Sequence, residues 1–135
     1  MLEKNRAVRE GFFDAIFVTA DGHVRESCSA NVFVVKNGVA RTPRADEHIL
    51  HGVTRGYLLE CAAQAGIPAE ETLLTRAELF NADEVFLSAT TFNVMPVTRL
   101  DDHPIGDGKV GPITRRLYEQ CLAGIGSVLA ACVIA

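Results

Sequence analysis

Short apolar runs separated by turn signals fill the first third of the chain. Residues 14–19 and 31–35 are rich in β-branched and aromatic side chains, which favours strands. An Asp-Gly pair at 21–22 and an Asn-Gly pair at 37–38 are typical of tight hairpin turns. We therefore predict a β-meander here, with the small polar segment 26–30 connecting two of its strands.

Helical periodicity marks three other segments. Residues 1–10 are charged and compatible with a helix, and residues 54–65 place apolar side chains on one helical face. Pro112 suits the first turn of a last helix, because its fixed φ angle fits that position. The predicted apolar face of this helix comprises Ile113, Leu117, Tyr118, Cys121 and Leu122.

The middle of the chain mixes both patterns. Thr75 and Glu78 have the spacing of a capping box, which predicts a short helix after Thr75. Strands are predicted at 71–74, 83–88 and 95–100. Strands that cluster early, with helices interspersed later, favour an α+β domain with a mixed sheet over a regular β-α-β repeat.

Composition and charge narrow the class of protein. The 135 residues are enough for one domain with a core, and 48% are hydrophobic, which excludes wholesale disorder. The formal net charge of -4 argues against a protein that coats nucleic acid or an acidic membrane. The N-terminus lacks the apolar core of a signal peptide, and the apolar stretch 125–135 is short for a membrane span. We expect a soluble, cytoplasmic protein without nucleic-acid or membrane partners.

The cysteines, the glycine-rich run and the histidine near a candidate site do not form known metal-binding or nucleotide-binding motifs. The four cysteines form no Cys-x-x-Cys pair and lack a histidine at zinc-finger spacing, so we predict buried thiols and no metal site. The glycine-rich run 106–111 lacks the spacing of a phosphate-binding Walker loop and is interpreted as a connector. His51 lies beside a candidate site, but a solvated loop residue is its expected role.

Two segments suit an anion. Gly52 and Thr54 stand at the start of the helix predicted from 54, where free N–H groups favour negative charge; an ordinary threonine cap is the alternative that local sequence favours. Residues 88–91 (Ser-Ala-Thr-Thr) follow an apolar strand and can turn N–H and O–H groups toward a phosphate. A capped turn into a short helical segment at 92–93 explains them equally well. Together the two segments indicate one phosphate bound from two sides.

Glu26 is the third candidate. It falls in the polar connection between two apolar strands, where a lone carboxylate is usually a solvated loop residue. A partly buried carboxylate there would instead hold a nearby ring nitrogen protonated, because a negative charge favours the cationic form of the ring.

These segments, in this order, resemble the C-terminal, cofactor-binding domain of the class IV (fold-type IV) aminotransferases. That family includes D-amino-acid and branched-chain aminotransferases and aminodeoxychorismate lyase. The matching stretches are 14–43, 49–67, 75–112 and 113–120. The resemblance implies an α+β fold with a mixed sheet or pseudo-barrel, pyridoxal 5′-phosphate as cofactor, and amino acids and 2-oxo acids as substrates.

The resemblance also implies cofactor-binding roles for single residues. Glu26 falls at the family's glutamate that pairs with the pyridine nitrogen of the cofactor. Val53 and Thr54 fall where the family binds the phosphate at a helix N-terminus. Ala89 and Thr90 fall at the second phosphate loop, where Ala89 can offer a backbone N–H but no hydroxyl.

Three further positions complete the comparison with the family. Thr91 lies where a backbone N–H helps to bind the substrate carboxylate in branched-chain enzymes. Asn31 matches a family asparagine, for which we infer a structural role only. Ser27 and Cys28 depart from the more usual Gly-Ser after the glutamate, which affects how the loop under the ring is positioned.

The family's Schiff-base lysine has no counterpart among the three lysines. By alignment it falls before Met1, and Lys4, Lys36 and Lys109 do not match it. We therefore expect residues 1–135 to form one cofactor-binding domain, truncated before the lysine, without the family's small N-terminal domain, and inactive alone. A homo-oligomer such as a dimer is the expected assembly.

The expected function is that of the cofactor-binding domain of an aminotransferase for branched-chain or D-amino acids. Two alternatives stay open at this point. One is a lyase of the aminodeoxychorismate type, which shares the fold and cofactor. The other is a non-catalytic remnant of the fold that oligomerises or binds a small anion.

Overall fold

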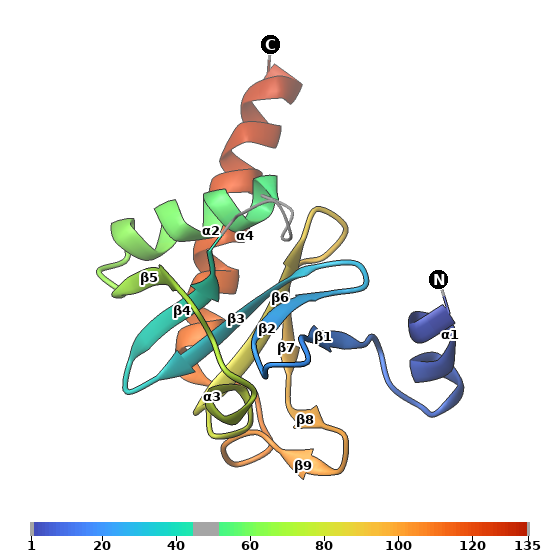
Figure 1. Cartoon of the computed structure of the whole chain (residues 1–135). Helices are drawn as coiled ribbons and strands as arrows, with labels where there is room; N and C mark the ends of the chain where they lie inside the picture. The colour runs from blue at the N-terminus through green and yellow to red at the C-terminus, as the bar shows by residue number, and fades with distance from the viewer. Residues whose placement is uncertain (1, 45–51, 135) are drawn as a thin grey trace.

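A five-stranded mixed sheet forms the centre of the molecule. The computed structural model describes residues 2–44 and 52–134, and the side chains of 3–44 and 52–123. The strand order is β5-β4-β3-β6-β7, in which β4 and β5 are parallel and all other neighbours antiparallel (Figure 1). The strands are β3 (Asn31–Lys36), β4 (Val39–Pro43), β5 (Ala69–Thr72), β6 (Glu84–Ala89) and β7 (Asn93–Val97).

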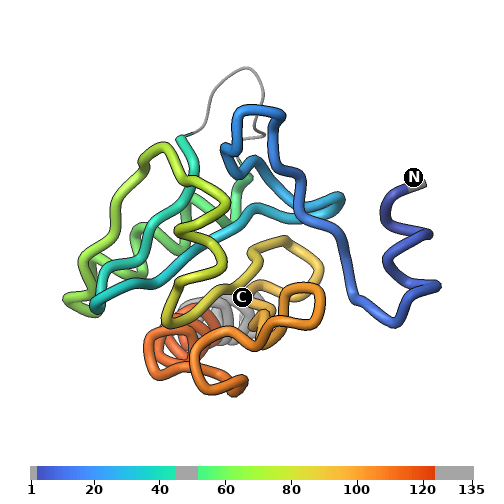
Figure 2. The backbone as a smooth tube through the Cα atoms, turned by 60° about the horizontal axis from the view of Figure 1, so that its bottom comes forward, coloured from blue at the N-terminus to red at the C-terminus, as the bar shows by residue number. Residues whose placement is uncertain are grey.

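Smaller elements surround this sheet. Two further two-stranded sheets pair β1 (Ile16–Val18) with β2 (Val24–Ser27), and β8 (Arg99–Leu100) with β9 (His103–Pro104). The helices are α1 (Leu2–Arg9), α2 (Val53–Gln64), α3 (Arg76–Phe80) and α4 (Pro112–Ile134). Helix α1 stands to one side of the sheet in two views (Figures 1 and 2). The predicted α+β class with a mixed sheet is confirmed, and the described strands close into no barrel.

Both faces of the central sheet are buried. On one face, Phe33 and Phe86 stack with ring centroids 4.8 Å apart and pack against α2 and α4. On the other face, alternate residues such as Val34 and Leu87 pack with Val24, Leu79 and other side chains of a second core. A strand that is buried on both faces is apolar without alternation, which explains the continuous run in β3.

Helix α2 links the two parallel strands β4 and β5 as a crossover. Its buried side chains include Leu58, Cys61 and Ala62, which belong to the predicted apolar face. Gly66 follows the helix with φ of 72°, a left-handed conformation that costs glycine little. The helix predicted at 54–65 is therefore confirmed, one residue earlier at each end.

Several local predictions are confirmed closely. The capping box is present: the Thr75 hydroxyl accepts the Glu78 N–H, and the Glu78 carboxylate accepts the Thr75 N–H. Asn37 and Gly38 both have positive φ between β3 and β4, as a type I′ turn requires. Cys61 and Cys121 are buried free thiols, Cys28 is half-buried, and the side chain of Cys132 lies outside the described part.

Other local predictions were wrong in part. The expected meander is divided between two sheets, and Glu26 lies within β2 rather than in a connection. The strand predicted at 71–74 begins and ends two residues earlier, and the one predicted at 95–100 is split into β7 and β8. Residues 92–93 are not helical, because the chain turns back there as a hairpin with Asn93 at φ of 62°.

The last helix differs from its predicted apolar face. Leu117 and Cys121 are buried, whereas Tyr118 and Leu122 are exposed. The packing stripe is thus narrower than the apolar pattern, because α4 contacts the sheet and α2 along one line only. No helix within the described residues combines the length and the hydropathy that a membrane span needs.

A buried carboxylate fixes the start of α4. Glu84, at the beginning of β6, is 7% exposed and accepts the N–H groups of Ile113 at 3.2 Å and Thr114 at 2.8 Å. These groups belong to the first turn of α4 and have no intrahelical acceptor. Gly111 gives the carboxylate room, since a Cβ there would lie 2.1 Å from the Glu84 side chain. The contact therefore joins α4 to the central strand.

Replacing Glu84 tests this attachment. We expect Glu84→Gln to lower the free energy of unfolding by about 1–3 kcal/mol, because one helical N–H then loses its charged acceptor. Urea unfolding followed by circular dichroism measures the change. Glu119→Gln, an exposed position on the same helix, should stay within about 0.5 kcal/mol of the wild type. Equal stability of the two variants would contradict the proposed role of Glu84.

Candidate functional site

The predicted site residues come together around one cavity. This cavity has a volume of about 300 Å³ and lies where β3 begins and β6 ends. Its described lining is made of residues 26–31, 52–54 and 88–90. The lining thus includes all five residues predicted to bind a cofactor: Glu26, Val53, Thr54, Ala89 and Thr90.

The N-terminus of α2 supplies one wall. The Gly56 N–H is the first to bond inside the helix, donating to the Gly52 oxygen at 3.1 Å. The N–H groups of Val53 and Thr54 precede it, at positions that helical bonding leaves unpaired. No side chain caps this helix at Gly52, and its first turn holds no acidic residue. An anion in the cavity would therefore meet free N–H donors and the positive end of the helix dipole.

The threonine-cap alternative for Thr54 does not hold. The N-cap residue of α2 is Gly52, and Thr54 lies inside the first turn. Its side chain is 8% exposed and lines the cavity, whereas the neighbouring Val53 side chain is 81% exposed. Val53 can therefore contribute its backbone N–H to a ligand, and Thr54 can contribute both an N–H and a hydroxyl.

A close approach between strand and helix shapes this wall. A Cβ on Gly52 would lie 2.3 Å from Oδ1 of Asn31, so the amide side chain packs directly against the start of α2. Asn31 is 7% exposed and also lines the cavity. The structural role expected for Asn31 fits this contact, and a side chain at position 52 would require the Asn31 amide to move.

The end of β6 forms the second wall. Ala89 is the last residue of β6 and pairs with Asn93 across the β6–β7 hairpin, and Thr90 begins the turn. Both line the cavity, whereas Thr91 is exposed and is not part of its described lining. The structure thus places Thr91 beside the site without bringing it into the cavity.

Glu26 stands on the third wall, in β2. Its side chain is half-buried and makes no hydrogen bond or ion pair with the described residues. The alternative of a loop residue does not hold, because Glu26 lies within strand β2 and lines the cavity. A carboxylate in this position can accept a hydrogen bond from a protonated nitrogen of a ligand.

A set of serine contacts closes the loop that follows Glu26. The Ser27 hydroxyl donates to the Ala30 oxygen at 3.1 Å, and the Ser29 N–H donates to Ser27 Oγ at 3.3 Å. The Ser29 hydroxyl donates to Asp14 at 2.6 Å. Partial burial acts to raise the pKa of Asp14, but the hydrogen bonds from Ser29 and the Ala15 N–H hold it below its ordinary value. Ser27, one of the departures from the family pattern, thus contributes an internal bond.

The second departure, Cys28, is a poor nucleophile. Burial, and then the negative charge of Asp14, raise the pKa of its thiol. The thiol therefore stays protonated at neutral pH, and we assign Cys28 to the cavity wall rather than to the chemistry.

Sequence reasoning did not single out Arg55. The Arg55 side chain is 0% exposed; its Nη2 donates to the Pro43 oxygen at 2.8 Å and to the Glu71 carboxylate. It ties the start of α2 to β4 and β5, and its charge is paired with the Glu71 carboxylate. A charged residue within the apolar pattern of a helix was the available signal. Ser88, which lines the cavity, belonged to the candidate segment 88–91, but sequence reasoning gave its side chain no separate role.

The lysines lie outside the described cavity lining. Lys36 donates to the Asn81 oxygen and pairs with Asp83, and Lys109 is exposed. Lys4 comes nearest, because its amino group donates to Ser29 Oγ at 3.1 Å. That none of the three corresponds to the family's Schiff-base lysine stays a prediction from the sequence. His51 lies outside the described residues, and among the described side chains no cluster of His, Cys, Asp or Glu is arranged for a metal ion.

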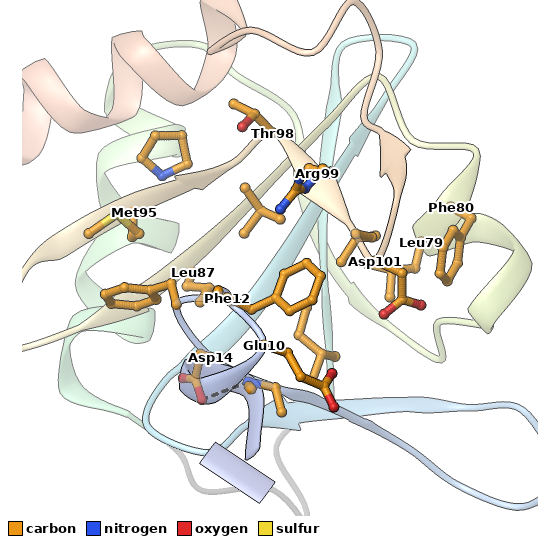
Figure 3. A pocket seen from close by; sticks show the side chains of 18 of the residues that line it. Glu10, Phe12, Asp14, Leu79, Phe80, Leu87, Met95, Thr98, Arg99 and Asp101 are labelled. Carbon is orange, nitrogen blue, oxygen red and sulfur yellow. Dashed lines mark hydrogen bonds between the residues drawn. The ribbon is translucent and has the colours of Figure 1, made fainter. Parts of the chain in front are cut away.

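A larger cavity of about 840 Å³ holds none of the predicted residues. It lies between the α1–β1 segment and β7–β8, with Phe12, Leu87, Met95 and Arg99 among its walls (Figure 3). The guanidinium of Arg99 stands over the Phe12 ring at 5.2 Å. This cavity borders strands β1 and β7, each of which has one neighbour in its sheet.

Sequence comparison identifies relatives that match most of the chain. Residues 1–100 match the family model described as amino-transferase class IV. A probable branched-chain-amino-acid aminotransferase of Aquifex aeolicus is 41% identical over 119 residues, 87% of this chain and 38% of that protein. The D-alanine aminotransferase of Listeria monocytogenes is 40% identical over 119 residues, 88% of this chain and 41% of that protein.

Solved structures agree with these relatives. The branched-chain amino acid aminotransferase of Escherichia coli has a TM-score of 0.85 at 36% identity, covering 91% of this chain and 41% of that one. The Thermobaculum terrenum enzyme of the same name, in its PLP-bound holo form, has a TM-score of 0.81 at 34% identity, covering 87% and 39%. The chain thus spans about two fifths of the length of its relatives. With the match over residues 1–100 and the shared fold, it belongs to the class IV aminotransferase family.

Proposed function

We propose that this chain is the part of a pyridoxal-phosphate-dependent aminotransferase that holds the cofactor, in an enzyme for branched-chain or D-amino acids. The observation that carries the proposal is the convergence of Glu26, the start of α2 and the end of β6 on one cavity. The relatives described above are aminotransferases, which favours transamination over the lyase reaction. One of them, the Thermobaculum terrenum enzyme, was solved with pyridoxal phosphate.

The residues of the cavity fit this cofactor. Its volume of about 300 Å³ lies at the lower end of the range for ligand pockets. The N–H groups of Val53 and Thr54 and the Thr54 hydroxyl would hold the phosphate from one side. The N–H groups of Ala89 and Thr90, and the Thr90 hydroxyl, would hold it from the other. Backbone N–H groups can bind a doubly charged phosphate without basic side chains. They therefore suit a chain whose net charge is -4.

Glu26 would determine the protonation of the ring. When bound, pyridoxal phosphate supplies an electron sink for negative charge that develops at the substrate's α-carbon. The Glu26 carboxylate would accept the N–H of the pyridine nitrogen and hold the proton at that atom. The serine contacts of the following loop hold the strand end that carries Glu26. Thr91, beside the cavity, would offer its N–H to the substrate carboxylate.

Binding of pyridoxal phosphate and of pyridoxal tests the phosphate contacts. Isothermal titration calorimetry should show binding of pyridoxal phosphate and at least about tenfold weaker binding of pyridoxal, because hydrogen bonds to a charged group are the stronger ones. Thr54→Val should weaken only pyridoxal phosphate, by about tenfold. Thr72→Val, a half-buried threonine on β5, is the matched control and should bind like the wild type. Equal affinity for both ligands would refute phosphate binding at this site.

Glu26→Gln tests the ring contact separately. An amide carries no charge, so the pKa of the bound ring nitrogen should fall, while the phosphate contacts remain. Absorbance of bound pyridoxal phosphate, recorded against pH, measures this pKa in both proteins. Glu60→Gln, an exposed carboxylate on α2, is the control. A titration that is identical in the wild type and Glu26→Gln would remove Glu26 from this role.

We also propose that these 135 residues alone hold the cofactor without a covalent bond and do not turn over substrate. The basis is the position of the three lysines, none of which lines the described cavity. Attachment and proton transfer at the α-carbon both need an amine that reaches the ligand.

Reduction with borohydride tests this second proposal. After incubation with pyridoxal phosphate and reduction, intact mass spectrometry should show no stoichiometric adduct, and an amino-acid/2-oxo-acid assay no turnover. Lys4→Arg, Lys36→Arg and Lys109→Arg variants assign any labelling that occurs. A stable adduct lost only in Lys4→Arg, accompanied by transaminase activity, would overturn the proposal, because Lys4 would then reach past Ser29 into the cavity.

A further inference from the structure

The β6 wall of the cavity contains a buried hydroxyl group without a partner. Ser88 is 1% exposed, and its Oγ makes no hydrogen bond within the described part of the chain. A buried hydroxyl that gives up water and finds no protein partner is destabilising, so such groups are uncommon in native structures. Those that persist call for an explanation such as a bound ligand.

Strand register shows where the Ser88 side chain lies. Ser88 is directly opposite Asn31 in the antiparallel pair of β6 and β3, so the two side chains share one face of the sheet. Asn31 packs against the start of α2 at Gly52. The next residue in β6 toward its start, Leu87, packs in the core of the opposite face. Ser88 is therefore on the side of the sheet that faces the free N–H groups of α2.

Position at the cavity distinguishes Ser88 from Thr114, whose hydroxyl is also buried and without a hydrogen-bond partner among the described residues. Thr114 lies in the first turn of α4, where its N–H donates to Glu84, and it is not part of the described cavity lining. Ser88 lies in that lining, between the two segments proposed to bind phosphate. Only Ser88 has a place for a ligand acceptor beside it.

We propose that Ser88 is a further phosphate ligand of this site, whose hydroxyl donates a hydrogen bond to a phosphate oxygen of the cofactor. The inference rests on the proposed function, because it needs pyridoxal phosphate in the same cavity. The hydroxyl is unsatisfied in the free chain and satisfied in the complex. Removing it therefore has opposite effects on the two states: the free chain loses a buried polar group, and the complex loses a charged hydrogen bond.

The experiment therefore measures both cofactor affinity and the stability of the free chain, on which removal of the hydroxyl should have opposite effects. Ser88→Ala should weaken binding of pyridoxal phosphate by about tenfold and leave pyridoxal binding unchanged, in calorimetric titrations. Urea unfolding without ligand should give a stability equal to or higher than that of the wild type. Thr114→Val, which removes the other unpartnered hydroxyl, should leave both affinities unchanged. Ser88→Cys keeps the size of the side chain with a weak donor and should reproduce the loss if Ser88→Ala does not fold.

The outcomes separate this inference from the function on which it rests. If the wild type binds pyridoxal phosphate and the Ser88 variants bind it equally well, Ser88 is not a ligand and the proposed function stands. If the Ser88 variants lose affinity for pyridoxal as well, the side chain supports the cavity generally and the inference fails. If the wild type binds no pyridoxal phosphate, the proposed function fails and this inference with it.

Discussion

The pairing of β3 with β6 is the constraint on which the rest of the structure depends. It runs from Asn31 opposite Ser88 to Val35 opposite Glu84, with both faces buried. At one end, the pairing brings the loop after Glu26 beside the end of β6 and so forms the cavity. At the other end, it places Glu84 under the first turn of α4. A shift of one residue would turn Ser88 away from α2 and Phe86 away from the helical core.

The cavity offers local donors for an anion in a chain whose net charge is negative. The net charge is -4, so long-range attraction does not favour a phosphate. The local field at the start of α2 does, because its first N–H groups have no intrahelical acceptor and belong to residues that line the cavity. Glu26 stands on a different wall, in β2, so the cavity offers donors to a phosphate and an acceptor to a ring.

Local sequence predicted those features of the fold that depend only on interactions between residues close together in the chain. The capping box at Thr75, the turn at Asn37 and the end of α2 before Gly66 each depend on a few neighbouring residues, and each was predicted. Local sequence offered an anion site at 52–54 and 88–91 only beside alternatives that explained the same residues as well or better. The resemblance to a family assigned the individual roles, since Val53 and Ala89 would contribute backbone groups that any residue can supply. The strand position of Glu26 and the partner-free state of Ser88 could not be predicted, because both depend on pairing across the sheet.

The proposed site consists mostly of backbone donors, which any residue can supply. Each sequence motif taken alone is therefore only a weak signal for it. Such a site constrains the sequence mainly at positions where the shape of the chain favours a small residue. Gly52 is one, because Asn31 occupies the space of a Cβ, and Gly111 is another, because Glu84 does the same. These two glycines fix α2 and α4 against β3 and β6. Binding geometry and fold stability therefore depend on the same two strands.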